Sequence, residues 1–306
     1  METLSTAFRD IIKEVMRLSK TEPLVTERNV YQPGSKEILP FLDQMVKSLC
    51  LPGSRIEGMD NLEELLAKAE AGKSCLLLPE HYSNMDLSLF SWFVRQAGGR
   101  GADIAEALVA IAGMKLTEDD PVVAAFASAY TRLVIYPSRS LAHLDTEKDR
   151  AEIVRSNTIN RAAMKTLLDI KVKGKLVLVF PSGTRYRPWD PSTKKGVREI
   201  DSYIRSFDYM CFVAVNGEVL HVRQKDMLED SVGQDLVLLS AGPVLSCAEF
   251  REKARAAAEA AGIEDKKQAT ADAIMEELER MHTAAEERRR QLLKQDPPRQ
   301  FAAHRA

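Results

Sequence analysis

Between residues 55 and 245 the sequence alternates short apolar runs with helical patterns, and this alternation constrains the fold more than any other feature. The apolar runs are strand-sized and rich in strand-forming residues, whereas the segments between them repeat apolar residues at helical spacing. Such alternation is typical of a sheet with helices on its faces. Strands are predicted at 74–78, 106–111, 132–136, 175–180, 210–215 and 235–240. Helices are predicted near 60–71, 84–97, 120–129, 148–173 and 195–206.

Helical patterns precede this core. Residues 1–20 predict an amphipathic helix with one apolar stripe, formed by Leu4, Phe8, Ile11, Val15 and Leu18. We favour packing of this stripe on the protein itself, and a helix lying on a membrane surface is the alternative. A second helix is predicted over 35–49, before Pro52 and Gly53 interrupt the chain.

Helical patterns also follow the core, over 247–295, with a break at Gly262 and an end at Pro297. The charged run 286–290 is interpreted as a solvated face with local ion pairs, with contact to anionic lipid head groups as the alternative. We therefore expect an α/β fold with a mixed central sheet flanked by helices. Its parts are a helical subdomain over 1–54, an α/β core over 55–246, and C-terminal helices with a flexible tail over 247–306.

The bulk composition is that of a soluble globular protein. Of the 306 residues, 45% are hydrophobic and 29% charged, and the net charge of −2 gives no general electrostatic case for binding nucleic acid. The cysteines stand singly, mostly beside apolar runs, which predicts buried reduced thiols: Cys50, Cys75, Cys211 and Cys247. No signal-like start and no membrane-spanning run are seen. We expect a cytoplasmic protein, with peripheral association on the inner membrane left open.

His81 and Asp86 are spaced as His-x4-Asp directly after an apolar run. On one continuous helix the two positions would lie about 140° apart and could not meet. They can meet if His81 precedes the helix and Asp86 lies in its first turn, with Ser83 or Asn84 as N-cap. The carboxylate would then fix the imidazole, which could act as a general base. A capping aspartate beside a half-buried histidine is the alternative. The other histidines lie in polar surroundings without such a pattern: His143, His221, His282 and His304.

A second turn is predicted directly after the apolar run 176–180, because Pro181 and Gly183 follow it. Arg185 and Arg187 alternate, so their side chains would point the same way in an extended segment. Two guanidinium groups suit a phosphate or a carboxylate. Further cations could widen this pocket: Arg139, Lys194 and Lys195. Surface charges paired with acidic neighbours are the alternative. A position after a strand favours the anion site, because α/β sheets bind ligands there. We expect the two turns to meet across one cleft.

Four blocks in this order resemble the glycerolipid acyltransferase family, which includes glycerol-3-phosphate and 1-acylglycerol-3-phosphate (lysophosphatidate) acyltransferases. The blocks are His81–Asp86 preceded by I-E-G-M-D-N-L at 56–62, V-I-Y-P-S-R at 134–139, F-P-S-G-T-R at 180–185, and the apolar stretch 212–215 followed by Gly242 and Pro243. They span about residues 55–245. Ser182 stands where the membrane-bound lysophosphatidate enzymes usually carry Glu. With R-Y-R-P at 185–188 it looks more like the soluble plastid-type glycerol-3-phosphate acyltransferases.

The resemblance implies transfer of a fatty acyl group from acyl-CoA or acyl carrier protein to the hydroxyl of glycerol 3-phosphate, in phospholipid biosynthesis. It implies His81 as base and Asp86 as its orienting group, and it assigns the acceptor phosphate to Arg139, Arg185 and Arg187. Supporting roles would fall to Ser182, Gly183, Thr184, Lys194 and Lys195. No metal and no cofactor beyond the acyl co-substrate are expected. The alternatives are a lysophosphatidate acceptor, a catalytically silent lipid- or acyl-carrier-binding protein of the same fold, and a hydrolase that activates water.

Overall fold

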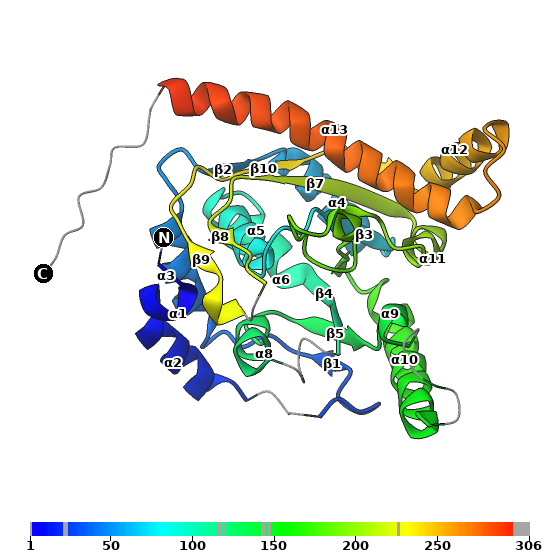
Figure 1. The fold of residues 1–306 in the computed structure, drawn as a ribbon. Helices are drawn as coiled ribbons and strands as arrows, with labels where there is room; N and C mark the ends of the chain where they lie inside the picture. Colours follow the sequence, from blue (N-terminus) through cyan, green and yellow to red (C-terminus); the bar gives the residue numbers. More distant parts are fainter. Residues whose placement is uncertain are drawn as a thin grey trace, which may run out of the picture.

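The computed structural model describes residues 2–20, 24–114, 118, 120–141, 145, 148–224 and 227–295. His143, His304 and the predicted tail from Pro297 lie outside these ranges. Within them a nine-stranded mixed sheet has the order β1-β5-β4-β6-β3-β7-β10-β2, with β11 paired to β7 (Figure 1). The strands of this sheet are β1 (Tyr31–Gln32), β2 (Arg55–Glu57), β3 (Cys75–Pro79), β4 (Leu108–Gly113), β5 (Arg132–Ile135), β6 (Leu176–Leu178), β7 (Tyr209–Asn216), β10 (Leu238–Ala241) and β11 (Leu245–Ser246).

Neighbouring strands from β5 through β4, β6 and β3 to β7 are parallel. Their carboxyl ends therefore meet at one edge of the sheet. In this register Cys75 of β3 lies beside Leu176 of β6 on one side and Tyr209 of β7 on the other. The antiparallel strands β1 and β10 extend the sheet at its two sides. A separate hairpin pairs β8 (Leu220–His221) with β9 (Ser231–Val232).

Both faces of the sheet are covered, which explains why β3 is an unbroken apolar run. Because successive strand residues point to opposite faces, Cys75 and Leu77 join one buried cluster and Leu76 and Leu78 the other. The first cluster packs under α1 (Leu4–Ala7), α2 (Arg9–Leu18), α3 (Leu39–Leu49), α4 (Met59–Glu70), α5 (Asp86–Gln96), α6 (Gly101–Ala107) and α8 (Pro121–Ala127). The second packs under α10 (Arg150–Ile170), α11 (Ile200–Ser206) and α13 (Lys266–Gln295).

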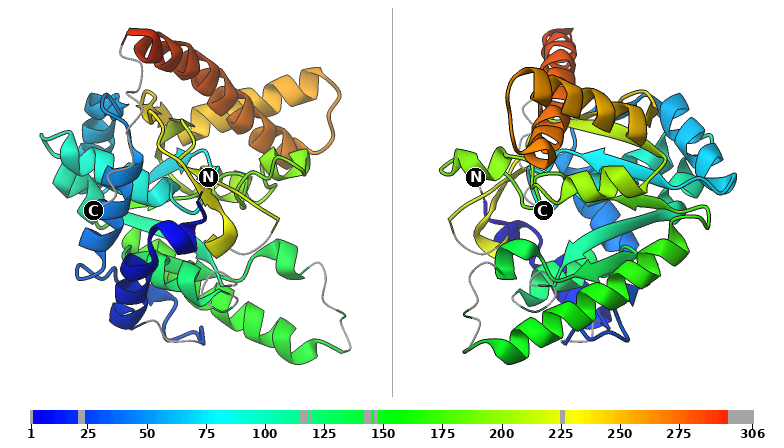
Figure 2. Two further views of the ribbon diagram at one scale, coloured as in Figure 1. Left: turned by 60° about the vertical axis from the view of Figure 1, so that its left-hand side comes forward. Right: turned by 90° about the vertical axis from the view of Figure 1, so that its right-hand side faces the viewer.

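Figure 2 shows α13 and α10 near opposite ends of the sheet. Helix α13 packs against β7 and β10, and α10 packs against β5. The chain also forms the longer helix α12 (Cys247–Ala260) and three short helical segments, α9 (Ser138–Leu141), η1 (Pro191–Lys194) and η2 (Met227–Glu229). The predicted α/β class, with a mixed sheet and helices at both ends of the chain, is confirmed.

Several predicted boundaries are wrong. The strand predicted at 106–111 begins only at Leu108, because Ala107 still ends helix α6, which the sequence analysis missed. The helix predicted over 195–206 begins at Ile200, after a turn in which the Ile200 N–H donates to the carbonyl of Val197. The helix predicted over 1–20 is two helices, because the chain leaves helical geometry at Phe8 (φ −125°).

The N-terminal helices share the main core. Leu4, Ile12 and Leu42 belong to the same buried cluster as Cys75 of the central strand. The N-terminal segment also contributes β1 to the sheet, through the pairing of Tyr31 with Leu133. The division of the chain at residues 54 and 246 stays a prediction.

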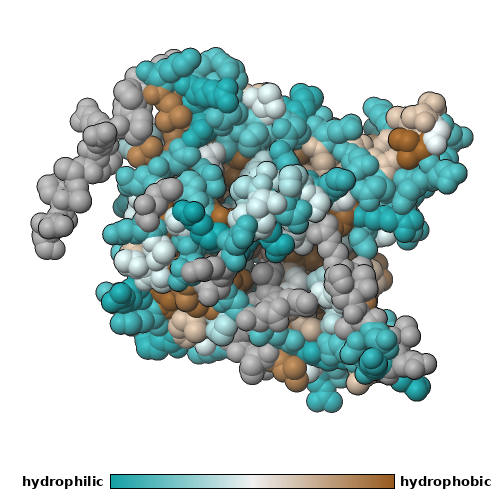
Figure 3. All heavy atoms as spheres, in the orientation of Figure 1, coloured by the Kyte–Doolittle hydropathy of each residue, from teal (hydrophilic) through white to brown (hydrophobic). Residues whose placement is uncertain are grey.

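The face of the molecule in Figure 3 is mostly hydrophilic, and hydrophobic residues show between the others in scattered groups. Among the described residues, no helix combines the length and the apolar character of a membrane-spanning segment. Cys75, Cys211 and Cys247 are buried free thiols, as the sequence predicted, whereas Cys50 is a free thiol that is only half-buried. Burial raises the pKa of Cys75 and Cys211 to about 12, so neither is a ready nucleophile.

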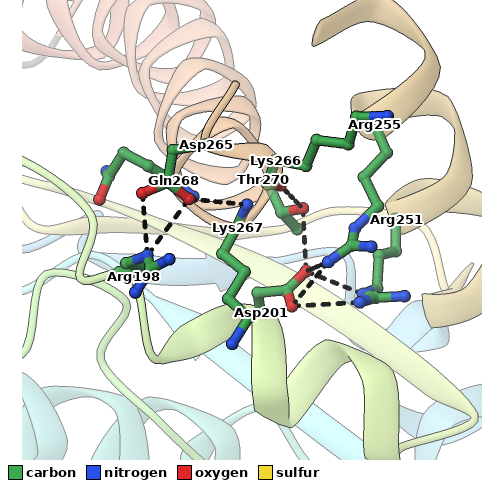
Figure 4. A network of polar contacts seen from close by, with 9 residues as sticks. All are labelled: Arg198, Asp201, Arg251, Arg255, Asp265, Lys266, Lys267, Gln268 and Thr270. Carbon is green, nitrogen blue, oxygen red and sulfur yellow. Dashed lines mark hydrogen bonds and ion pairs between the residues drawn. The ribbon is translucent and has the colours of Figure 1, made fainter. Parts of the chain in front are cut away.

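The C-terminal helices are tied to the core through a buried carboxylate. Asp201 of α11 is 1% exposed and accepts hydrogen bonds from Arg251 Nε (2.8 Å), Arg255 NH2 (3.2 Å) and Thr270 Oγ1 (3.0 Å) (Figure 4). Burial alone would raise the pKa of Asp201, but these donors outweigh it and lower the pKa. The network joins α11, α12 and α13 into one packed unit.

The charged run 286–290 is only partly a local solvated face. Arg289 pairs with Glu286 of its own helix at 3.0 Å, as predicted. Arg288, however, contacts Glu57 of β2 at 3.0 Å, and Arg289 also contacts Asp235. These contacts with residues distant in the sequence fix the last turns of α13 to the sheet side of the molecule.

Candidate active site

His81 lies at the carboxyl edge of the parallel strands. Strand β3 ends at Pro79, and the chain passes through Glu80 and His81 before α5 begins at Asp86. Because β6 and β7 run parallel to β3 on either side, three carboxyl ends meet here, and sheets of this kind bind ligands at that edge. The His81 side chain is 15% exposed, so the ring is sheltered but reachable from solvent.

Asp86 holds the imidazole through Nδ1. The distance from His81 Nδ1 to Asp86 Oδ2 is 2.9 Å, and the carboxylate side chain is 3% exposed. The carboxylate also accepts hydrogen bonds from the backbone N–H groups of Tyr82 (2.6 Å) and Ser83 (2.9 Å). Since a carboxylate accepts, a neutral His81 ring carries its proton on Nδ1 and leaves Nε2 as an acceptor. The pair has the geometry of a base and its orienting carboxylate.

The start of α5 differs from the prediction. The N-cap is neither Ser83 nor Asn84 but Met85, whose side chain makes no cap hydrogen bond. The Ser83 hydroxyl instead accepts from the Met85 N–H (3.1 Å) and donates to Asp86 Oδ1 (2.8 Å). The Asp86 carboxylate thus closes the turn that precedes the helix, through the N–H groups of Tyr82 and Ser83. Asp86 does lie in the first helical turn, as predicted.

The arginine-containing turn lies directly against His81. The Phe180 ring stacks on the imidazole with centroids 3.9 Å apart and planes inclined by 18°. The backbone N–H of Tyr186 donates to the carbonyl of His81 at 2.8 Å. This contact follows from the topology, because β6, which leads into the turn, is the immediate neighbour of β3. The two motif segments, distant in the chain, are brought together.

Arg185 is held by a carboxylate that the sequence analysis did not anticipate. Its NH1 lies 2.8 Å from Oδ2 of Asp230, which is 0% exposed, and the Arg185 side chain is 15% exposed. Asp230 also accepts from the backbone N–H of Arg223 at 2.7 Å. Arg187, by contrast, is exposed. The two arginines of the turn therefore differ in environment, where the sequence pattern predicted equivalent roles.

Three of the proposed supporting residues build the turn itself. Buried Ser182 donates from Oγ to the carbonyl of Thr184 at 2.7 Å. Gly183 has φ +65°, and a Cβ there would lie 2.9 Å from Val197 Cγ1. Glycine suits both constraints. The Gly183 N–H donates to the Phe180 carbonyl at 2.9 Å.

The remaining cations lie around this turn or along the same sheet edge. Lys194 is paired with Glu279 of α13, and Lys195 is exposed. The backbone of Arg139 lies in α9, directly after β5. With about 4.8 Å between neighbouring strands, β5 is about 14 Å from β3. Arg139 thus shares the edge with His81 but lies three strands away.

A protein-family model described as Acyltransferase matches residues 54–229, more than half of the chain. The chain belongs to the Acyltransferase family. No curated protein matches it. The family expected from the motifs is therefore confirmed, and the protein is an enzyme of acyl transfer in lipid biosynthesis. The soluble plastid-type branch stays a prediction.

A cluster of side chains that was not predicted from the sequence flanks the histidine of this acyltransferase. Glu80 and Tyr82, the neighbours of His81, both contact His282 of α13. Glu80, directly after a buried apolar strand, could have indicated that a partner exists, because a buried carboxylate needs hydrogen-bond donors. Nothing marked His282, which lies 202 residues further along the chain and outside the matched segment.

Among the described residues of the acyltransferase, no three His, Cys, Asp or Glu side chains gather where they could hold a metal ion. The groups available for chemistry at this edge are the imidazole of His81, the guanidinium groups of the neighbouring turn and backbone N–H groups. This set can accept a proton and bind an anion.

Proposed function

We propose that this acyltransferase moves a fatty acyl group from an acyl thioester to the hydroxyl of glycerol 3-phosphate. One observation carries the proposal. The Asp86-bound ring of His81 touches the turn that bears Arg185 and Arg187, through the Phe180 stack and the Tyr186–His81 hydrogen bond. A proton acceptor thus lies against a turn that carries two cations, and such a pair of groups suits a phosphorylated alcohol.

In the proposed mechanism His81 Nε2 accepts the proton of the acceptor hydroxyl. The hydroxyl oxygen attacks the thioester carbonyl, the new C–O bond forms, and the C–S bond breaks. The proton then passes from His81 to the departing thiolate, so the enzyme returns to its starting state. Asp86 keeps the ring in one orientation and stabilises its protonated form, as a carboxylate bound to Nδ1 does.

The arginines would hold the acceptor phosphate. Arg187 is exposed and contributes a full positive charge. The Arg185 charge is partly offset by Asp230, but a guanidinium has several N–H donors and can bind a second anion while this ion pair persists. Arg139, whose backbone lies at the same edge, is the third proposed phosphate ligand, and Lys195 would add positive charge. Fixing the phosphate turns a bimolecular attack into an oriented one.

The soluble plastid-type branch is supported by Ser182 and by R-Y-R-P at 185–188. We propose acyl-CoA or acyl carrier protein as donor, and a cytoplasmic location with the membrane surface as a further contact. No observation on the molecule favours lysophosphatidate over glycerol 3-phosphate.

The test is an acceptor assay with purified enzyme and one acyl donor, followed by product analysis. We expect acylation of glycerol 3-phosphate to exceed that of 1-acylglycerol 3-phosphate and to be lost in His81→Ala. Faster turnover of the lysophosphatidate would change the acceptor and keep the chemistry. Release of free fatty acid without dependence on any acceptor would indicate a hydrolase, and no thiol release from any donor would indicate a silent binding protein.

A further inference from the structure

A buried carboxylate lies immediately before His81. Glu80 is 4% exposed, and it receives hydrogen bonds from the backbone N–H of Val215 (2.9 Å), the hydroxyl of Tyr82 (2.9 Å) and Nδ1 of His282 (2.8 Å). Burying a carboxylate is costly unless donors surround it, and an opposite charge helps most. Of these three donors, only His282 can carry a positive charge.

His282 in turn faces charged and polar groups from several elements, both acidic and basic. Glu80 and Tyr82 face it from the end of β3, Glu279 from its own helix, and Lys194 from η1. Burial by itself would lower the pKa of His282, but the hydrogen bond and charge of Glu80 outweigh burial and raise it. The pKa of Tyr82 is raised by burial first and then by Glu80, so its hydroxyl stays a neutral donor.

Helix α13 presents His282 from a well-anchored position. Ile274, Leu278 and Ala285, which precede and follow His282 on this helix, are each 0% exposed. At the same turn, the side-chain amide of Asn216, at the end of β7, donates to the His282 carbonyl at 3.1 Å. Helix α13 runs along the β7 and β10 side of the sheet (Figure 1). The imidazole of His282 is therefore a fixed point next to the carboxyl edge.

Both residues that flank His81 are held by this fixed point. Glu80 is bonded to His282 directly, and the Tyr82 hydroxyl lies 3.4 Å from the same Nδ1. The backbone N–H of Tyr82 also binds Asp86 Oδ2, the oxygen that receives His81 Nδ1. We propose that His282 is a positioning residue, which fixes the His81–Asp86 pair by holding Glu80 and Tyr82 on either side of it. The expected effect of His282 on kcat rests on the proposed function. Its effect on the position of the His81 ring can be measured without substrate.

The kinetic test compares His282→Ala, the double variant Glu80→Gln/His282→Ala, and the matched control His221→Ala. His221 is also a partly buried histidine beside a glutamate, with 3.2 Å between its Nδ1 and Glu218 Oε1, but it lies on the separate β8–β9 hairpin. We expect His282→Ala to lower kcat about tenfold with little change in acceptor KM, because a misplaced base slows the transfer step and not phosphate binding. The double variant should recover most of kcat, because a neutral amide at position 80 does not need a cation. His221→Ala should be unchanged.

The substrate-free test is an NMR pH titration of the His81 ring in the same proteins, with resonances assigned through the variants. We expect the His81 titration midpoint and ring shifts to move in His282→Ala, to return toward wild type in the double variant, and to stay fixed in His221→Ala. If His282→Ala does not fold, His282→Asn, which retains a neutral donor, takes its place with a smaller expected change. An unchanged His81 titration would overturn the proposal, whatever happens to kcat, and so would failure of Glu80→Gln to restore the His81 titration.

These readouts separate the inference from the proposed function. If wild-type enzyme transferred no acyl group to glycerol 3-phosphate, the proposed function would fail. The His81 titration would still decide whether His282 positions the ring.

Discussion

The two turns at the carboxyl edge are held in different ways. In the His81 turn the orienting carboxylate comes from five residues further on, and the hydrogen bonds that fix Asp86 come from the residues between them. In the neighbouring turn Arg185 is held by Asp230, 45 residues away, beyond the central strand β7. The hydrogen bonds to the Asp86 carboxylate are thus made within its own segment, although Glu80 and Tyr82 on either side of His81 also contact His282. The geometry of the neighbouring turn depends on the packing of the β8–β9 region against the core.

This difference predicts different consequences of substitution. Changes in the His81 turn should act mainly on the chemical step, since His81 touches the proposed reacting atoms and Asp86 holds its ring. Substitutions in the arginine turn should have two kinds of effect. Loss of the exposed Arg187 should weaken acceptor binding alone, whereas loss of Arg185, which neutralises a buried carboxylate, should also lower stability.

The largest effect is expected from His81→Ala. Loss of a general base typically lowers the rate by about 10² to 10⁴, and we expect kcat for acyl transfer to fall about 10³-fold. Steady-state kinetics with thiol release gives the measurement, and His221→Ala serves as the control. A kcat within tenfold of wild type would mean that His81 is not the base.

A smaller loss in kcat is expected from Asp86→Asn, about 10²-fold. The neutral amide oxygen is a weaker acceptor for His81 Nδ1 than the carboxylate, so the ring is held less firmly and its protonated form loses the stabilising charge. Circular dichroism should show a folded protein, because the asparagine oxygen can still accept from Tyr82 and Ser83. A wild-type pH–rate profile in this variant would show that Asp86 plays no part in orienting the base.

The two arginines give the sharpest test of the comparison. Arg187→Ala should raise the acceptor KM about tenfold, equivalent to about 1.4 kcal/mol of binding, with an unchanged melting temperature because the side chain is exposed. Arg185→Ala should also raise this KM and in addition lower the free energy of unfolding by about 3 kcal/mol, since it removes the cation from a buried pair.

The double variant Arg185→Ala/Asp230→Asn separates the two effects. Its free energy of unfolding should return toward the wild-type value, whereas its acceptor KM should stay as high as in Arg185→Ala. Equal melting temperatures for Arg185→Ala and Arg187→Ala would contradict the distinction between the two side chains.

The smallest effect is a pH dependence of stability from His282. The pKa of His282 is raised on folding, so its contribution is fully present below its ordinary value of 6.5 and is lost as pH rises through the folded value. The melting temperature of wild type should exceed that of His282→Asn by about 2 °C at pH 6, and the difference should shrink by pH 9. A difference that grows with pH would have the wrong sign for a protonated His282.

The same contrast explains what the sequence could predict. The strand predicted at 74–78, the helix predicted near 84–97 and the meeting of His81 with Asp86 all depend on spacing over a few residues, and the structure contains all three with slightly shifted ends. The two-residue strand Tyr31–Gln32 and the short helix Gly101–Ala107 carry too few residues for a periodic signal. The ion pairs Arg185–Asp230 and Glu80–His282 depend on tertiary packing, so no local pattern identified Asp230 or His282 as the partner.

The capping prediction failed for a different reason. Ser83 and Asn84 have the side chains that usually cap helices, but the Asp86 carboxylate binds the N–H groups of Tyr82 and Ser83. A residue that also orients His81 therefore closes the turn. Cap preferences describe isolated helix ends. Here the hydrogen bonds of Asp86 with His81, Tyr82 and Ser83 determine the conformation of the turn.

The most direct measurement compares acyl transfer to glycerol 3-phosphate and to glycerol by wild type, His81→Ala and Arg187→Ala. If base and cations serve one site, wild type should prefer the phosphorylated acceptor by about 100-fold in kcat/KM, equivalent to about 2.7 kcal/mol. Arg187→Ala should lose part of this preference, and His81→Ala should lose turnover of both acceptors. Equal use of the two acceptors by wild type, or a preference unaffected by Arg187→Ala, would contradict the account.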